Sequence, residues 1–285
     1  MINGYELVDF GHGRKLERFA GVTVDRPSPA AERAVPQHPE LWNEPAARYE
    51  RSEAGQRAWR STLPLPDPWA VQLGRLTFEL RTTAAGQVGL FPEQIANWDW
   101  LAGRLSASRQ AGGQTKQVLN LFAYTGGSTL AAAATGAAVV HVDAARSAVA
   151  WARRNAAASG LSEAPIRWIV DDARKFAAQE RKRGKHYDGV ILDPPSYGHG
   201  SGGEAWKLER DLEPLLADCA ALTGPNPGFM LLSCHAPGYG AEELAALLRR
   251  WFPHAKMDAD DMHLATDDGH LLHSGARSRF AASES

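Results

Sequence analysis

The stretch that decides the fold is VLNLFAYTGGSTLAAAATGAAVVHVDAARSAVAWARRN, residues 118–155. An apolar segment (118–122) leads into a turn with two glycines (125–127). An alanine-rich helix follows, and a second apolar segment (138–142) ends at Asp143. This order of parts predicts a strand, helix and strand unit of the kind that binds mononucleotides. The turn has neither G-x-G-x-x-G nor G-x-x-x-x-G-K-[ST], so we do not expect it to cradle phosphates. Asp143 is placed instead to accept hydrogen bonds from a ribose diol.

Three further segments continue this alternation. RWIVDDA (167–173) predicts a third strand that ends in acidic residues, and YDGVILDPPSYGHG (187–200) predicts a fourth that ends in Asp-Pro-Pro. FMLLS (229–233) predicts a fifth. In a parallel, doubly wound sheet these strand ends meet along one crevice. The predicted fold class is therefore α/β, with a mostly parallel, Rossmann-like sheet.

The turns at these strand ends form a recognisable set. NLFAYTGG, VDAA, VDDA and DPPSYG occur in this order, and together they resemble the class I S-adenosylmethionine-dependent methyltransferases. Within that superfamily the chain is similar to the branch that contains bacterial large-subunit ribosomal RNA methyltransferases, in which a GLFPEQ-like segment, here 89–94, precedes the first strand. The resemblance covers roughly residues 70–250. It implies S-adenosylmethionine as the cofactor and RNA as the partner.

Length and composition predict a globular chain of one or two domains. The 285 residues are 44% hydrophobic and 22% charged, which allows a substantial core. Residues 1–66 predict a small β-rich module, although its polar segment 47–59 reads as helical. The closely spaced prolines of LPLPDPW (63–69) predict a linker. We expect residues 67–285 to form the methyltransferase domain, with a helix that begins near Pro92.

Charge and cysteine usage exclude several classes of protein. The net charge of −2 gives no basic footprint for nucleic acid, and the basic run 181–185 reads as the cap of a helix end rather than an RNA contact. No apolar run is long enough for a membrane span, and no signal peptide is visible, so we expect a cytoplasmic protein. Two cysteines, histidines without ligand spacing and an acidic run (258–261) that reads as a loop predict no disulfide framework and no metal.

The resemblance implies a cofactor pocket along the crevice. Asp143 with Ala144 would meet the ribose diol, and Asp172 with Ala173 the adenine. The residues expected around the methionine end are Asn120, Phe122, Ala123, Tyr124, Thr125 and Gly126. The alternative is that the aspartates only cap the helices that follow them, but their order at successive strand ends favours the cofactor. Relatives commonly carry Ser where this chain has Ala145, so no hydroxyl contact is expected there.

The family pattern also assigns the reacting end of the pocket. Phe91 and Gln94 would close it, and Asp193 with Pro194 would lie near the transferred methyl group. Asp193-Pro194-Pro195 is a stiff turn that lacks two N–H donors, so it suits a flat substrate held by Pro195. Tyr197 would either stack on that substrate or pack beneath the crevice. The glycines at 198, 200, 202 and 203 predict a flap or a surface connection.

Cys234 raises the question of covalent catalysis. Methylation of cytosine C5 usually requires a thiolate that adds to C6 and an acid near N3, roles that Cys234 and Asp193 could fill. Related cytosine-C5 enzymes carry a TCS-like motif at this strand end, whereas this chain has SCH. A small core residue is the alternative for Cys234. His235 could accept a proton, activate the thiol or pair with a carbonyl.

Three functions remain open from the sequence. The first is methylation of RNA, at cytosine C5 through Cys234 or at a nitrogen held by Asp193. The second is methylation of a small molecule or protein, which the near-neutral charge favours. The third is a non-catalytic cofactor-binding module, against which the intact DPPSYG argues. The sequence leaves open the oligomeric state and whether the N-terminal module contacts RNA or only supports the sheet.

Overall fold

A computed structural model describes residues 4–51, 55–110, 114–199, 205–224 and 227–282. The chain divides into two compact units. The N-terminal unit comprises Met1–Glu93 and His263–Ser274, and the larger unit comprises Gln94–Met262 and Gly275–Ser285. Residues 200–204 of the predicted flap lie outside the described residues.

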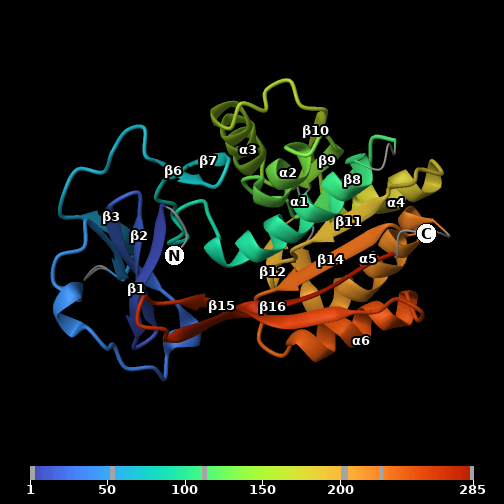
Figure 1. Cartoon of the computed structure of the whole chain (residues 1–285). Helices are drawn as coiled ribbons and strands as arrows, with labels where there is room; N and C mark the ends of the chain where they lie inside the picture. Colours follow the sequence, from blue (N-terminus) through green and yellow to red (C-terminus); the bar gives the residue numbers. More distant parts are fainter. Residues whose placement is uncertain (1–3, 52–54, 111–113, 200–204, 225–226, 283–285) are drawn as a thin grey trace. The chain divides into compact units, whose positions relative to one another are not determined.

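The sheet of the larger unit confirms the predicted fold class (Figure 1). Its strands are β8 (Gln117–Leu121), β9 (Ala138–Asp143), β10 (Ile166–Val170), β11 (Gly189–Leu192), β14 (Phe229–Cys234), β15 (Asp258–Ala265) and β16 (Leu271–Ala281). The spatial order is β10-β9-β8-β11-β14-β16-β15; the first five strands are parallel, and β16 runs antiparallel to β14. The direction of winding reverses between β8 and β11, which is where such sheets bind ligands, at the carboxyl ends of the strands.

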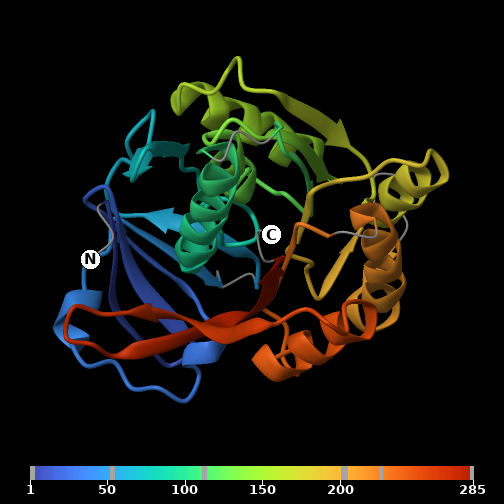
Figure 2. The ribbon, with the colours of Figure 1, turned by 45° about the vertical axis from the view of Figure 1, so that its right-hand side comes forward.

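Helices cover both faces of this sheet, as Figures 1 and 2 show. They are α1 (Ile95–Gln110), α2 (Gly127–Ala133), α3 (Arg146–Ala158), α4 (Ala173–Lys182), α5 (Leu208–Thr223) and α6 (Ala241–Trp251). Side chains of α4, α5 and α6 form one apolar core with the sheet, and α1 and α2 contribute to another. Because both faces are covered, the central strands are almost entirely apolar, and every residue of β11 and β14 is buried. Two short strands, β12 (Tyr197–His199) and β13 (Ala205–Lys207), form a hairpin before α5.

The N-terminal unit is built on a five-stranded sheet of order β1-β2-β3-β4-β5. Its strands are β1 (Tyr5–Gly11), β2 (Arg14–Phe19), β3 (Val22–Pro27), β4 (Ala47–Arg51) and β5 (Arg57–Ser61). The short 3-10 helices η1 (Pro29–Ala31) and η2 (Pro39–Trp42) lie between β3 and β4, and η3 (Pro92–Gln94) precedes α1. A separate hairpin joins β6 (Ala70–Leu73) and β7 (Leu76–Glu79).

The N-terminal unit extends beyond the boundary at residue 66 that the prolines suggested. The Trp69 indole packs edge-on against Phe19, with ring centroids 6.3 Å apart. The Tyr49 hydroxyl donates to the carbonyl oxygen of Ala84 at 2.6 Å. These contacts bind residues 69–84 to the first sheet, which is why the division falls at Glu93.

Two local predictions were wrong. Segment 47–59, expected to be helical, forms strands β4 and β5, in which Ala47 and Tyr49 are buried and Arg48 is only partly so. The alternation of buried and outward side chains has period two, so charged residues do not prevent a strand. The acidic run 258–261, expected to be a loop, opens β15, because Arg277 and Arg279 of β16 pair with Asp258 at 3.0 and 2.7 Å.

The basic run 181–185 lies at the end of α4, where Arg181 pairs with Asp218 of α5 at 2.9 Å. Within the described residues, no helix combines the length and the apolar character that crossing a bilayer requires. In the same ranges, no three His, Cys, Asp or Glu side chains gather closely enough to hold a metal ion.

Candidate active site

The turn between β8 and α2 holds an unusual backbone conformation. Phe122 and Tyr124 have φ of 56° and 49°, and Gly126 has φ of 94°. Residues other than glycine rarely adopt this left-handed region. Backbone strain of this kind is found most often at functional sites. The turn is held by two backbone bonds of 3.0 Å, from Ala123 to the carbonyl of Val142 and from Gly126 to the carbonyl of Ala123.

The glycines of the turn allow neighbouring side chains to pack closely against its backbone. A Cβ on Gly127 would lie 2.3 Å from the Trp98 ring of α1, and a Cβ on Gly126 would lie 3.1 Å from the Cβ of Ala152 on α3. The amide of Asn155 donates to the carbonyl of Thr125 at 2.9 Å. The turn from Asn120 to Gly126, which we call the cradle, thus has a fixed shape.

A buried polar chain supports the turn from below. The Asn120 amide donates to the Thr129 hydroxyl at 2.9 Å, and that hydroxyl lies 2.9 Å from Nδ1 of His141. The Thr129 hydroxyl thus connects the Asn120 side chain to the His141 ring. Burial, together with the charge of Arg153, lowers the pKa of His141 to about 3, so the ring is neutral.

Asp143 ends β9 and faces the same turn. Its carboxylate accepts backbone hydrogen bonds from Tyr124 and Ala145, both at 2.8 Å. Burial raises the pKa of Asp143, and these two bonds lower it only in part. A carboxylate offers about four acceptor positions, so two remain for a diol. The helix-capping alternative does not hold for Asp143, because Ala145 is the N-cap residue of α3 and, within the described residues, no side chain caps that helix. The bond from Tyr124 ties the carboxylate to the turn between β8 and α2.

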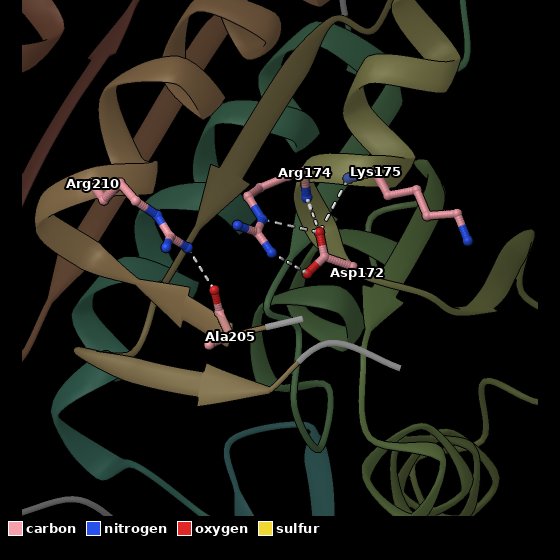
Figure 3. A pocket seen from close by; sticks show the side chains of 5 residues that line it. All are labelled: Asp172, Arg174, Lys175, Ala205 and Arg210. Carbon is pink, nitrogen blue, oxygen red and sulfur yellow. Dashed lines mark hydrogen bonds and ion pairs between the residues drawn. The ribbon is translucent and has the colours of Figure 1, made fainter. Parts of the chain in front are cut away.

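Asp172, the predicted adenine partner, begins α4 as a helix cap (Figure 3). Its Oδ1 accepts from the backbone N–H groups of Arg174 and Lys175 at 2.9 and 3.1 Å. The Arg174 guanidinium donates to both carboxylate oxygens at 3.2 Å and lies 3.0 Å from Asp211 of α5. A cavity of about 520 Å³ adjoins this cluster, lined by Asp172, Arg174, Lys175, Ala205 and Arg210. Ala173, the other residue expected at the adenine, is the buried first residue of α4.

Asp193 lies at the end of β11 within a group of polar side chains. The Gln94 amide donates to Oδ2 of Asp193 at 3.1 Å, and the Ser233 hydroxyl donates to Oδ1 at 2.8 Å. Nε2 of His235 lies 3.6 Å from Oδ1. Asn97 of α1 donates to the Gln94 amide oxygen at 2.7 Å, which fixes the direction of that amide. We call Asp193, Gln94, Ser233 and His235 the acidic cluster.

Sequence reasoning found only part of the acidic cluster. Gln94 was expected beside the cofactor, and its amide contacts Asp193, the residue expected near the methyl group. Ser233 was missed, although one signal was available: neighbours on a strand face opposite sides, so only one of Ser233 and Cys234 can face Asp193. Phe91 belongs to the N-terminal unit, whereas Gln94 is the first residue of the larger unit.

Cys234 faces the apolar core under α5 and α6. It is fully buried among the residues of that core, and its sulfur accepts a hydrogen bond from the backbone of Ala236 at 3.4 Å. Burial raises the pKa of the Cys234 thiol to about 11, and the charge of Asp193 adds to the effect. A neutral thiol that faces the core is poorly disposed to act as a nucleophile. Cys219 on α5 is also fully buried.

The turn after Asp193 leads into the β12–β13 hairpin. The carbonyl of Pro195 accepts a hydrogen bond of 2.6 Å from the Trp206 indole. Tyr197, the predicted stacking residue, is 55% exposed. An exposed tyrosine beside the turn fits the stacking alternative better than packing beneath the crevice.

Comparison with known proteins gives an independent view of the chain. Residues 46–246 match the model of a family described as S-adenosylmethionine-dependent methyltransferase. The crystal structure of a SAM-dependent methyltransferase from Agrobacterium tumefaciens is 33% identical, with a TM-score of 0.91 over 99% of this chain and 92% of that one.

Two curated relatives carry ribosomal RNA in their names. Ribosomal RNA large subunit methyltransferase I of Shewanella frigidimarina is 27% identical over 93% of this chain and 70% of its own length. Ribosomal RNA large subunit methyltransferase K/L of the same organism is 34% identical over 39% of this chain and 16% of its own length. The chain spans 16%, 20% and 56% of the lengths of the first three curated relatives.

Proposed function

Since the chain belongs to the family of S-adenosylmethionine-dependent methyltransferases, we propose that it methylates a base of RNA, and of ribosomal RNA in particular. The acidic cluster beside the Pro-Pro turn carries this proposal, because the Asp193 carboxylate held there offers hydrogen-bond acceptors to an amino group of a base. The names of the curated relatives support RNA as the substrate. A protein that methylates ribosomal RNA would act in the cytoplasm.

The cofactor fits the residues that the fold brings together. When bound, S-adenosylmethionine supplies a methyl group on a sulfonium centre. The cradle from Asn120 to Gly126 would hold the methionine end, Asp143 with Ala144 the ribose, and Asp172 with Ala173 the adenine. For Asp172 to bind adenine, Arg174 must break part of its hydrogen bonding to that carboxylate. The Arg174 guanidinium can remain paired with Asp211.

The acidic cluster would orient the nucleophile. Gln94 and Ser233 each donate to the Asp193 carboxylate, which leaves acceptor positions of that carboxylate for a substrate. We propose that Asp193 accepts a hydrogen bond from an amino group of the base, so that the nitrogen lone pair faces the methyl group. His235, at 3.6 Å, would carry the released proton to solvent, and Tyr197 would stack on the base.

Transfer to nitrogen is better supported than transfer to cytosine C5. The C5 route needs a thiolate that can reach the base, whereas Cys234 faces the core with a pKa raised to about 11. The nitrogen route needs only a positioned acceptor, which Asp193 provides. We therefore propose an amino or ring nitrogen as the target.

The test is transfer of radiolabelled methyl from S-adenosylmethionine to RNA from cells that lack this gene. We expect label with the wild type and with Cys234→Ala, and no label with Asp193→Asn. Binding of S-adenosylhomocysteine, measured by calorimetry, should be retained in both variants. Mapping the label by nucleoside analysis identifies the atom that is methylated.

The net charge of −2 favours a small molecule or a protein as the alternative substrate. No label on any RNA from a wild type that binds the cofactor would reject RNA and support this alternative. Absence of turnover with protein and small-molecule extracts as well would indicate a non-catalytic cofactor-binding module.

A further inference from the structure

Trp206 joins three parts of the candidate site. This residue of β13 is 3% exposed, and its indole N–H donates to the carbonyl of Pro195 at 2.6 Å. Its ring lies 4.8 Å from the ring of Phe122, centroid to centroid, in the cofactor cradle. The guanidinium carbon of Arg174 lies 5.8 Å from the centre of the indole ring.

The Pro-Pro turn depends on donors from outside itself. Pro194 and Pro195 have no N–H, so neither residue can donate a backbone hydrogen bond that would hold the turn in place. β13 and the start of α5 supply donors: the Trp206 indole of β13 donates to the carbonyl of Pro195, and the backbone N–H of Leu208, the first residue of α5, donates to the carbonyl of Ser196 at 3.1 Å. The direction of the turn that carries Asp193 is therefore set in part by Trp206.

Arg174 extends the same connection to the predicted adenine site. It bonds Asp172 at 3.2 Å and lies 3.0 Å from Asp211, which in turn accepts from the backbone of Lys207 at 2.8 Å. Lys207 follows Trp206 directly. Lys207 is thus linked, through Asp211 and Arg174, to Asp172, the carboxylate expected at the adenine. The neighbouring Trp206 is bonded to the turn expected at the substrate.

We propose that Trp206 is a positioning residue, which holds the Asp193-Pro194-Pro195 turn at a fixed distance from the cofactor cradle. Its ring contact with Phe122 sets one side of this spacing, and its bond to Pro195 sets the other. The catalytic consequence rests on the proposed methyl transfer, because a misplacement of about 1 Å between reacting groups can lower a rate roughly 100-fold.

The test is Trp206→Phe, which keeps an aromatic ring against Phe122 and removes the N–H donor. We expect kcat on RNA to fall about 10- to 100-fold, while KM for S-adenosylmethionine and Kd for S-adenosylhomocysteine change less than about threefold. The matched control is Trp69→Phe in the N-terminal unit. Trp69 is also buried, and its indole also donates to a backbone carbonyl, that of Phe19 at 3.4 Å. This control should leave kcat unchanged.

A second measurement does not depend on the substrate. Amide hydrogen exchange of peptides that cover 189–198 and 205–213 should be about tenfold faster in Trp206→Phe than in wild type, with unchanged exchange in β8 and β9. Unchanged exchange of these two peptides would overturn the positioning role. A loss of protection from exchange that is spread evenly over the sheet would overturn it too. So would normal kcat with the Trp206→Phe variant. If wild type labels no RNA, the proposed substrate fails, and the exchange experiment still decides the role of Trp206.

Discussion

Ser233 and Cys234 are adjacent, yet they belong to different environments. The Ser233 hydroxyl donates to Asp193 at 2.8 Å, whereas the Cys234 sulfur lies in the core beneath α5 and α6. The alternation of a strand separates them, since consecutive side chains point to opposite faces. One position of register thus decides whether a hydroxyl or a thiol reaches the acidic cluster.

The two residues offer a matched pair of substitutions. We expect Ser233→Ala to lower kcat about tenfold, because Asp193 loses a charge-assisted hydrogen bond worth about 1.5 kcal/mol. Cys234→Ala should leave kcat within about twofold and lower the free energy of unfolding by about 1 kcal/mol through lost packing. Steady-state kinetics and denaturant unfolding measure both. Loss of transfer in Cys234→Ala, with cofactor binding intact, would restore the covalent route.

Asp143 links cofactor affinity to pH. Burial raises the pKa of its carboxyl, so the acceptor form of the side chain is lost earlier than usual as the pH falls. We expect the affinity for S-adenosylhomocysteine to decline toward acid pH through this raised pKa. Asp143→Asn should bind at least about tenfold more weakly, because an amide cannot accept from both Tyr124 and Ala145, and a tenfold loss corresponds to about 1.4 kcal/mol. Calorimetry over a pH series tests this; a pH-independent affinity in wild type would argue against the diol role.

At the scale of elements, the contact of α1 with α2 depends on the absence of a side chain at one position. A Cβ on Gly127 would lie 2.3 Å from the Trp98 ring, far closer than packed atoms allow. Gly127→Ala should therefore push α2 away from α1, lower stability by about 1–3 kcal/mol and weaken cofactor binding through the cradle. Gly103, within α1, has no atom near its Cβ position. Gly103→Ala should raise stability by about 0.5–1 kcal/mol and serves as the control in thermal unfolding. Equal behaviour of the two variants would contradict the contact.

The elements also differ in how far the sequence could predict them. The parallel strands were predictable because burial on both faces requires apolar runs, as in β11 and β14. β4, β5 and β15 were not, since their charged residues are neutralised by pairing that no local pattern reveals, such as Asp258 with Arg279. The same holds for the candidate site. Strand ends pointed to Asp143 and Asp193, but the bond from Trp206 to Pro195 joins a hairpin that sequence spacing does not predict.

At the scale of the whole molecule, the two units respond to acid in different pH ranges. Burial lowers the pKa of His141 in the larger unit to about 3, well below its usual value near 6.5. In the N-terminal unit, burial would raise the pKa of Glu17, but Arg26, Lys15 and hydrogen bonds outweigh it and lower that pKa to about 2. Both groups bind protons more readily when unfolded, so both stabilise the fold at neutral pH and lose this effect as the pH falls.

The pKa values of the two groups predict which unit begins to lose stability first as the pH falls. From pH 6.5 down to about 3, protonation of unfolded His141 should lower the stability of the larger unit by about 1.4 kcal/mol per pH unit. The N-terminal unit should weaken mainly below pH 4.5, where unfolded Glu17 is protonated. His141→Asn keeps a polar partner for Thr129 and should remove the part of the slope that His141 causes, while the part that Glu17 causes remains. Denaturant unfolding at several pH values tests this, and an unchanged slope in the variant would contradict a neutral buried ring.

The chain passes between its units after Glu93, Met262 and Ser274, so the segment 263–274 is built into the N-terminal unit although the sequence around it belongs to the other. Leu264 and Leu272 are buried there, and His38 lies 3.4 Å from Asp268. A gene split after codon 93 would therefore separate residues 1–93 from the segment 263–274 that completes their unit. Expressed together, they should purify as one complex through a tag on either fragment; expressed alone, the longer fragment would expose the apolar side of an orphaned hairpin and aggregate.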